Sequence, residues 1–173
     1  MSAAVRDLLS EKKSSILERW FDIVLEAYRS EASGFFKKGK RQFANPVGYT
    51  LSQGLESVLD ELLREQELDV DKISPALDSI IRIRAVQDLT PSQALVFIFR
   101  LKKILREEIE RAGFAHSEEI EVLESRIDVI ALISFDLYIK CREKIYDLKA
   151  NELRNMTFRL LQKANLVCEI PEQ

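Results

Sequence analysis

The chain has 173 residues, of which 46% are hydrophobic and 32% are charged, with a formal net charge of −3 at pH 7. This length and balance suit one globular domain, and five glycines and four prolines are too few for a loop-rich β-sandwich or barrel. The slightly acidic charge argues against nucleic acid as the main partner, because phosphate binding needs a basic face.

No stretch reaches the run of about 18 apolar residues that would predict a membrane span. The first residues carry charges where a secretory signal peptide needs its apolar run, so we expect a cytoplasmic protein. Two cysteines, Cys141 and Cys168, are too few for a disulfide framework. Cys141 lies on the apolar face of a predicted helix, where a buried free thiol is expected.

Hydrophobic residues recur at helical spacing along the chain. The first predicted helix covers residues 3–30. A loop at residues 35–41 follows, with two phenylalanines and four basic residues. We expect its aromatic rings to pack on the fold and its cations to face water, although contact with an acidic lipid surface or nucleic acid is an alternative. The second helix is predicted from Asn45-Pro46, an N-cap followed by proline, to about residue 67.

Two further helices are predicted to begin with a capping residue and a proline. The third begins at Ser74-Pro75 and ends near residue 88. The fourth begins at Thr90-Pro91, and Gln93 completes a capping box with Thr90. Its first turns are apolar on every face, so we expect that half to lie at the centre of the fold.

The last predicted helix begins near residue 117, after Gly113 has ended the preceding helix in a left-handed conformation. It can run unbroken to about residue 167, a length of roughly 75 Å. Its hydrophobic pattern slips and then resumes with an apolar stripe at Leu153, Met156 and Leu160. We expect this stripe to be an interface between two copies of the chain. The alternative is a bend at residues 149–151 that folds the helix back over its own bundle.

The chain is therefore predicted to have an all-α fold. Residues 1–148 form a single bundle of about five helices, for which a globin-like arrangement is one version, and residues 149–173 form a C-terminal helix extension.

The sequence offers little for catalysis. His116 is the only histidine, which excludes His-rich metal sites and most nucleophile–base pairs, and its place before an acidic helix start predicts a surface or capping role. No Gly-rich phosphate-binding loop is present. We predict no catalytic residue, metal or cofactor, and hence no enzyme; an enzyme that uses only carboxylates is the remaining alternative.

Arg84 is predicted to lie near the middle of the apolar arc of the third helix, with Gln87 at its edge. An unpaired buried cation is strongly unfavourable, so this guanidinium needs carboxylate or carbonyl partners. Two hypotheses remain open. Arg84 is either part of a buried ion pair that fixes the helix register, or the clamp of a pocket for an anionic ligand.

The run IRIRAVQDLTPSQA, from Ile81 to Ala94, resembles the signature of the N-terminal sensory domain of RsbRD-type RsbT co-antagonists, the stressosome sensor family of bacteria. The run FANPVG at residues 43–48 is similar to a second landmark, and the resemblance covers roughly residues 8–146. It implies an all-α input domain with a motif that can be structural or line a ligand pocket. The motif residues are Asn45, Pro46, Arg84, Gln87, Pro91, Ser92 and Gln93.

In full-length co-antagonists a C-terminal STAS domain carries the phosphorylated residues. Residues 149–173 hold no such domain, so we expect a stand-alone form, to which phospho-regulated co-antagonism does not carry over. Our leading hypothesis is a signalling or regulatory domain that binds protein partners of a signalling complex and forms a homodimer. The alternative is a globin-like sensor of a small ligand or tetrapyrrole.

Overall fold

The computed structural model describes residues 2–26, 45–87, 89–114 and 118–164, and these ranges contain six α-helices and no strand. The predicted all-α class and the long C-terminal helix are therefore confirmed. His116, Cys168 and the loop at residues 35–41 lie outside the described residues. The helices are α1 (Ala3–Glu11), α2 (Lys13–Leu25), α4 (Pro46–Leu62), α5 (Val70–Val86), α6 (Pro91–Arg111) and α7 (Glu118–Lys163).

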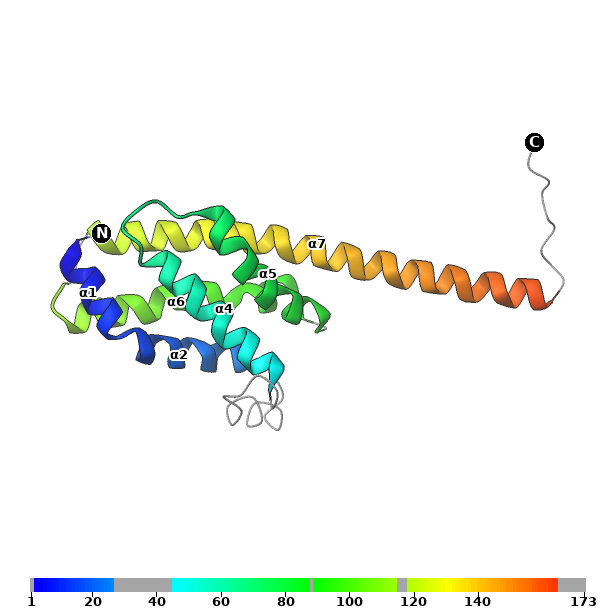
Figure 1. Cartoon of the computed structure of the whole chain (residues 1–173), viewed down its shortest axis with the longest axis horizontal. Coiled ribbons are helices and arrows are strands. Elements are labelled where there is room, and N and C mark those ends of the chain that lie inside the picture. Colours follow the sequence, from blue (N-terminus) through cyan, green and yellow to red (C-terminus); the bar gives the residue numbers. More distant parts are fainter. Residues whose placement is uncertain (1, 27–44, 88, 115–117, 165–173) are drawn as a thin grey trace.

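The first five of these helices and the first half of α7 form one bundle, and the second half of α7 extends beyond it as a single rod (Figure 1). Within the bundle α4 packs on α5, α5 on α7, and α6 on both α2 and α7. The buried hydrophobic side chains, among them Trp20, form one continuous core. None of the described helices has a stretch long and apolar enough to cross a membrane.

The predicted starts of α4 and α6 are confirmed in atomic detail. The Asn45 side chain accepts a hydrogen bond from the Gly48 amide at 2.9 Å, which caps α4. At α6 the Gln93 amide donates to the Thr90 hydroxyl at 3.3 Å, and the Thr90 amide donates to the Gln93 side chain at 2.9 Å. Both caps satisfy amide groups that have no partner inside the helix. Gly113 has the predicted left-handed conformation, with a φ of 86°.

The prediction of one unbroken first helix was wrong. Lys12 leaves helical geometry, with a ψ of 2°, and separates α1 from α2. The backbone hydrogen bonds from Lys12 to Leu8 and from Ile16 to Lys12 persist, so the chain changes direction while helical hydrogen bonds continue on both sides of the bend. The hydrophobic spacing continues across the bend, and no proline or glycine marks it in the sequence. Within the described residues there are therefore six helices where about five were predicted.

The predicted start of the third helix was also wrong. The helix α5 begins at Val70, where the Asp69 side chain caps the Lys72 amide at 3.3 Å, and Pro75 lies inside the helix. Proline removes one backbone donor, yet the earlier start adds a turn that places Ile73 in the core. The preceding helix ends earlier than predicted, because Glu61 accepts hydrogen bonds from Arg64 and from the Asp69 amide and holds the connection in place.

The helix α7 continues straight past the end of the bundle (Figure 1). Tyr138 is its last fully buried residue and Ile145 its last partly buried one; every residue from 146 to 164 is exposed. The chain therefore does not bend back at residues 149–151.

Gly54 of α4 lies against Ile80 of α5, with no room for a side chain. A Cβ atom at this position would lie 2.7 Å from Cγ1 of Ile80 and 2.9 Å from its Cδ1. Overpacking of this kind costs about 1–3 kcal/mol, against a gain of up to about 1 kcal/mol in helix propensity. We expect Gly54→Ala to lower the free energy of unfolding by about 1 kcal/mol in urea denaturation. The exposed Ser52→Ala on the same helix is the control, and equal stability of the two variants would contradict the close contact.

Candidate functional site

Arg84 lies at the junction of three helices. Its side chain is buried, with 1% of the residue exposed, as the apolar arc of its helix predicts. The Nε atom donates a hydrogen bond to the Ala94 carbonyl at 2.6 Å, and Nη2 donates to the Gln93 carbonyl at 2.9 Å. The Nη1 atom donates to the Val24 carbonyl at 3.1 Å. The guanidinium thereby joins α5 to the first turn of α6 and to the end of α2.

Two aromatic rings complete this junction. The guanidinium carbon of Arg84 lies 5.1 Å from the centre of the Phe97 ring, within the range of a cation–π contact. The Trp20 indole donates a hydrogen bond to the Phe97 carbonyl at 2.9 Å, and the two ring centres are 6.0 Å apart. Side chains from α2, α5 and α6 therefore meet in one buried cluster, in which Arg84 contacts backbone carbonyls and the Phe97 ring.

The other motif residues mostly begin or end helices. Pro46 and Pro91 are the exposed first residues of α4 and α6, and Gln87 is the C-terminal cap of α5. The Ser92 hydroxyl lies 3.1 Å from that of Thr90. Among the motif residues the structure joins Arg84 directly to Gln93, through the backbone of Gln93.

Two further arginines bind helix ends in the same manner, and the sequence did not reveal them. Arg126 of α7 donates to the carbonyls of Leu62, Arg64 and Gln66 at 2.6–3.1 Å, just where α4 ends. Arg142 of α7 donates to the Ala85 carbonyl at 3.1 Å, in the last turn of α5. Backbone carbonyls are present at every residue, so no pattern of residue types could have marked these partners.

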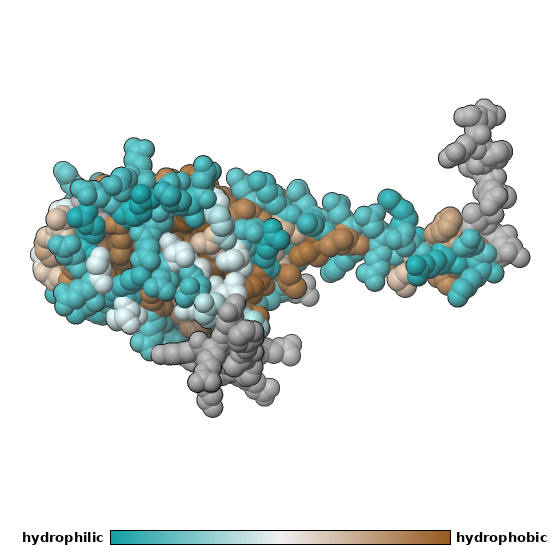
Figure 2. Space-filling view, viewed as in Figure 1, coloured by the Kyte–Doolittle hydropathy of each residue, from teal (hydrophilic) through white to brown (hydrophobic). Residues whose placement is uncertain are grey.

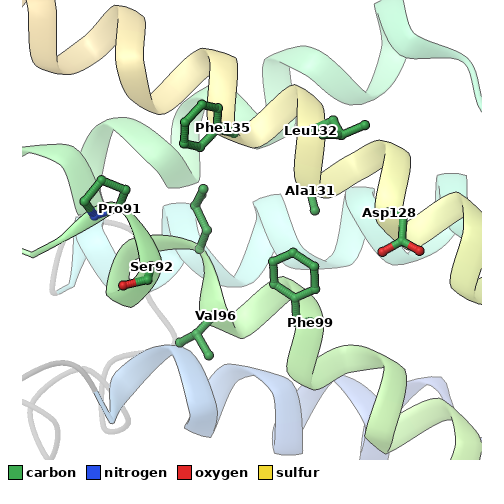
Figure 3. Close-up of a pocket in the computed structure, with 9 residues that line it drawn as sticks. Pro91, Ser92, Val96, Phe99, Asp128, Ala131, Leu132 and Phe135 are labelled. Atoms are coloured by element: carbon green, nitrogen blue, oxygen red, sulfur yellow. The ribbon is translucent and has the colours of Figure 1, made fainter.

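A surface groove lies between α6 and α7. Its volume is about 890 Å³, and the close-up shows apolar side chains of both helices facing it, with Asp128 at one end (Figure 3). Phe99 of α6 and Phe135 of α7 are about half exposed, and Leu132 is 69% exposed. The groove is lined by Pro91, Ser92, Leu95, Val96, Phe99, Asp128, Ala131, Leu132 and Phe135.

The groove corrects one expectation from the sequence. The first half of α6 is apolar on every face, which predicted a central position. Its inner side chains, such as Phe97 and Ile98, are in the core, but Val96 and Phe99 on the other side are exposed. An apolar outer face of this kind is typical of a surface that binds another molecule.

The helix α7 carries two apolar rows on different faces. The inner row is buried in the bundle, repeats at the helical spacing and ends at Tyr138. The outer row repeats every seven residues and runs from the groove to the far end of the helix, through Leu132, Ile139, Tyr146, Leu153 and Leu160. The inner row has no fully buried member after Tyr138, and beyond Ile145 only the outer row continues.

The outer row reaches water along the projecting half of α7. Leu153 is 64% exposed and Leu160 is 65% exposed, and Met156 lies exposed beside them. Hydrophobic residues break the polar surface of this rod in the space-filling view (Figure 2). These three residues are the predicted interface.

The described residues offer little for metal binding or for nucleophilic chemistry. The part of the chain that the structure describes contains no cluster of His, Cys, Asp and Glu that could hold a metal ion. Cys141 is a free, partly buried thiol, and burial raises its pKa. Its thiolate form is therefore scarce near neutral pH, which makes it a weak nucleophile.

These features define a helical domain whose exposed apolar surfaces lie in a groove and along a projecting helix. A family model, described as the RsbT co-antagonist protein rsbRD N-terminal domain, matches residues 14–153. The chain belongs to this family, which suggests a sensor domain of stress signalling. The match includes the Arg84 cluster, the groove and the start of the projecting helix. Comparison with curated proteins and with solved structures gives no match.

The structural role of Arg84 can be tested with three variants. Arg84→Ala should lower the free energy of unfolding by about 3 kcal/mol or more, because it leaves a cavity and carbonyls without their donor. Arg84→Met fills the space but leaves the Val24 carbonyl without this donor, so we expect a smaller loss of about 1–3 kcal/mol.

The matched control is Arg82→Met on the same helix. Arg82 is exposed and paired with Asp78 at 2.5 Å, a surface ion pair that is worth less than about 1 kcal/mol. Urea denaturation of the three variants gives the comparison. If Arg84→Ala were as stable as Arg82→Met, the guanidinium would not hold the helices together, and the ligand-clamp hypothesis would be favoured instead.

Proposed function

We propose that this chain is a signalling or regulatory domain that acts by binding proteins rather than by catalysis, and that it works as a homodimer. The observation that carries this proposal is the outer apolar row of α7. Each of its residues from Tyr146 onward is exposed, although the helix continues without a break from the core of the bundle.

Exposed apolar surface of this extent favours association. Removal of such surface from water contributes about 25 cal/mol per Å². A row that repeats every seven residues is the pattern by which two helices pack as a coiled coil. A second copy of the chain carries the same row, so two copies can cover each other.

The groove between α6 and α7 supports protein binding over small-molecule binding. Small-molecule sites enclose most of the ligand and direct a few polar groups at it. In this groove Phe99, Leu132 and Phe135 are about half exposed or more, and its only polar lining side chains are Ser92 and Asp128. A shallow apolar groove of this kind suits the face of a helix.

The homodimer can be tested by placing charges on the row. We expect Leu153→Glu combined with Leu160→Glu to raise the dimer dissociation constant at least ~100-fold, since each lost leucine burial costs about 1.5–3 kcal/mol. Sedimentation equilibrium would measure this constant. Both side chains are exposed in the single chain, so the substitutions should not disturb the fold. The circular dichroism spectrum of the variant should then match that of the unmodified chain.

The matched control places the same charges on the opposite side of the rod. Asn155→Glu combined with Gln162→Glu changes two exposed residues outside the row, and the dimer should persist. An unmodified chain that stays monomeric at high concentration would refute the homodimer.

A further inference from the structure

A second groove lies between α5 and α7, at the end of the bundle from which α7 projects (Figure 1). Its volume is about 360 Å³, and its described lining residues all come from these two helices. Along α7 the lining extends from Leu137 to Leu148, which is about three helical turns at ~1.5 Å per residue. This α5–α7 groove is long enough for a short helix to lie in it.

Apolar side chains form a continuous strip along the α5–α7 groove. Leu137, Cys141 and Ile145 of α7 are partly buried and pack against the core. Val86 at the end of α5 is 74% exposed, and Leu148 is 62% exposed. Removal of such side chains from water is favourable, so an apolar partner surface would gain free energy here.

Cations flank the apolar strip on both helices. Arg82 of α5 and Lys140 and Lys144 of α7 are exposed and line the groove. Asp78 is the one acidic residue among the described lining residues, and it is already paired with Arg82 at 2.5 Å. Burial raises the pKa of the Cys141 thiol, and the charges of Arg82 and Lys144 work against this shift. Positive charge in excess therefore acts on the middle of the groove from both sides.

We propose that the α5–α7 groove binds an acidic amphipathic helix of a protein partner. The apolar strip would take the hydrophobic face of that helix, and carboxylates on either side of the face would meet the flanking cations. This inference rests on the proposed function, since it names the chemistry of one protein partner of the domain.

Two features of the groove favour a helix over other acidic partners. The helices α5 and α7 satisfy their own backbone groups, so the groove has no strand edge with which an extended peptide could pair. An anionic membrane surface is flat, whereas Leu137 and Ile145 are partly buried between the two helices. A convex helix can reach these side chains and keeps its own backbone hydrogen bonds.

The α5–α7 groove lies on the opposite side of α7 from the outer row. Lys144 lines the groove and Tyr146 belongs to the row, and two residues turn a helix by about 200°. On the rod, the side that continues the groove carries the polar, exposed residues Asn155 and Gln162, eleven and eighteen residues after Lys144. A partner helix in the groove therefore leaves the outer row free for a second copy of the chain.

Fluorescence anisotropy of the full chain with a synthetic peptide tests this proposal. The probe is a fluorescein-labelled, hydrocarbon-stapled helix with leucines on one face and glutamates beside that face. A second probe has lysine in place of every glutamate. We expect the acidic probe to bind, and its dissociation constant to rise at least ~10-fold in Lys140→Glu combined with Lys144→Glu, because two attractive charges become repulsive. The lysine probe should bind the unmodified chain at least ~10-fold more weakly than the acidic probe.

The matched control reverses two exposed cations outside the groove. Lys12→Glu combined with Lys103→Glu gives the same change in net charge, and the acidic probe should bind this variant as it binds the unmodified chain. An equal loss of binding in the two double variants, or equal binding of the two probes, would overturn the proposal. Binding to vesicles of anionic phospholipid that needs Lys140 and Lys144, without binding of the acidic probe, would assign the groove to a membrane surface instead.

The Cys141 thiol shows whether the probe occupies the groove. In a chain with Cys168→Ala, the bound acidic probe should slow the reaction of Cys141 with N-ethylmaleimide, because Cys141 lines the groove. An unchanged rate at saturating probe would mean that the probe binds elsewhere, which contradicts the proposal.

The same probe separates this proposal from the homodimer. The Leu153→Glu and Leu160→Glu double variant should bind the acidic probe as the unmodified chain does, since the groove lies away from the outer row. Probe binding by an unmodified chain that is monomeric would support the groove and refute the homodimer. A dimer that does not bind the acidic probe would refute the groove and leave the homodimer intact.

Discussion

The bundle depends on contacts between arginine guanidinium groups and backbone carbonyls at helix ends. The last four carbonyls of an α-helix have no intrahelical partner, and the negative end of the helix dipole favours a cation there. Arg84 supplies that cation to the end of α2, Arg126 to the end of α4, and Arg142 to the last turn of α5. A planar guanidinium offers five N–H donors in a fixed arrangement, so it can bind several carbonyls at once. Three connections between helices are fixed in this way.

The sequence predicts those parts of the structure that local chemistry determines. A capping residue followed by proline located two helix starts, and an apolar arc around Arg84 predicted its burial. The bend at Lys12 was missed because packing alone causes it. Pro75 misled because Asp69, earlier in the chain, is an equally good cap whose use places Ile73 in the core. The particular carbonyls that the guanidinium groups bind could not be predicted, because every residue has a main-chain carbonyl whatever its side chain.

The sequence located Leu153, Met156 and Leu160, but the rest of the candidate interaction surface needed the structure because α7 carries two repeats at once. The inner row follows the 3.6-residue period of a helix packed in a bundle, and the outer row follows the seven-residue period of a helix packed on another helix. Read along the chain, the two rows merge into one pattern with a slip after Leu148. Only burial separates them, since it shows that Tyr138 faces the core while Leu132 faces water.

The projecting part of α7 also has a mechanical consequence. The helix contains neither glycine nor proline between Glu118 and Lys163, so it has no built-in hinge. Its free part is roughly 27 Å long, and a tilt of about 10° where it leaves the bundle displaces its far end by ~5 Å, close to the rise of one helical turn. A small repacking around Arg142 and Tyr146, where α7 parts from α5, would therefore be amplified at a distance by leverage alone.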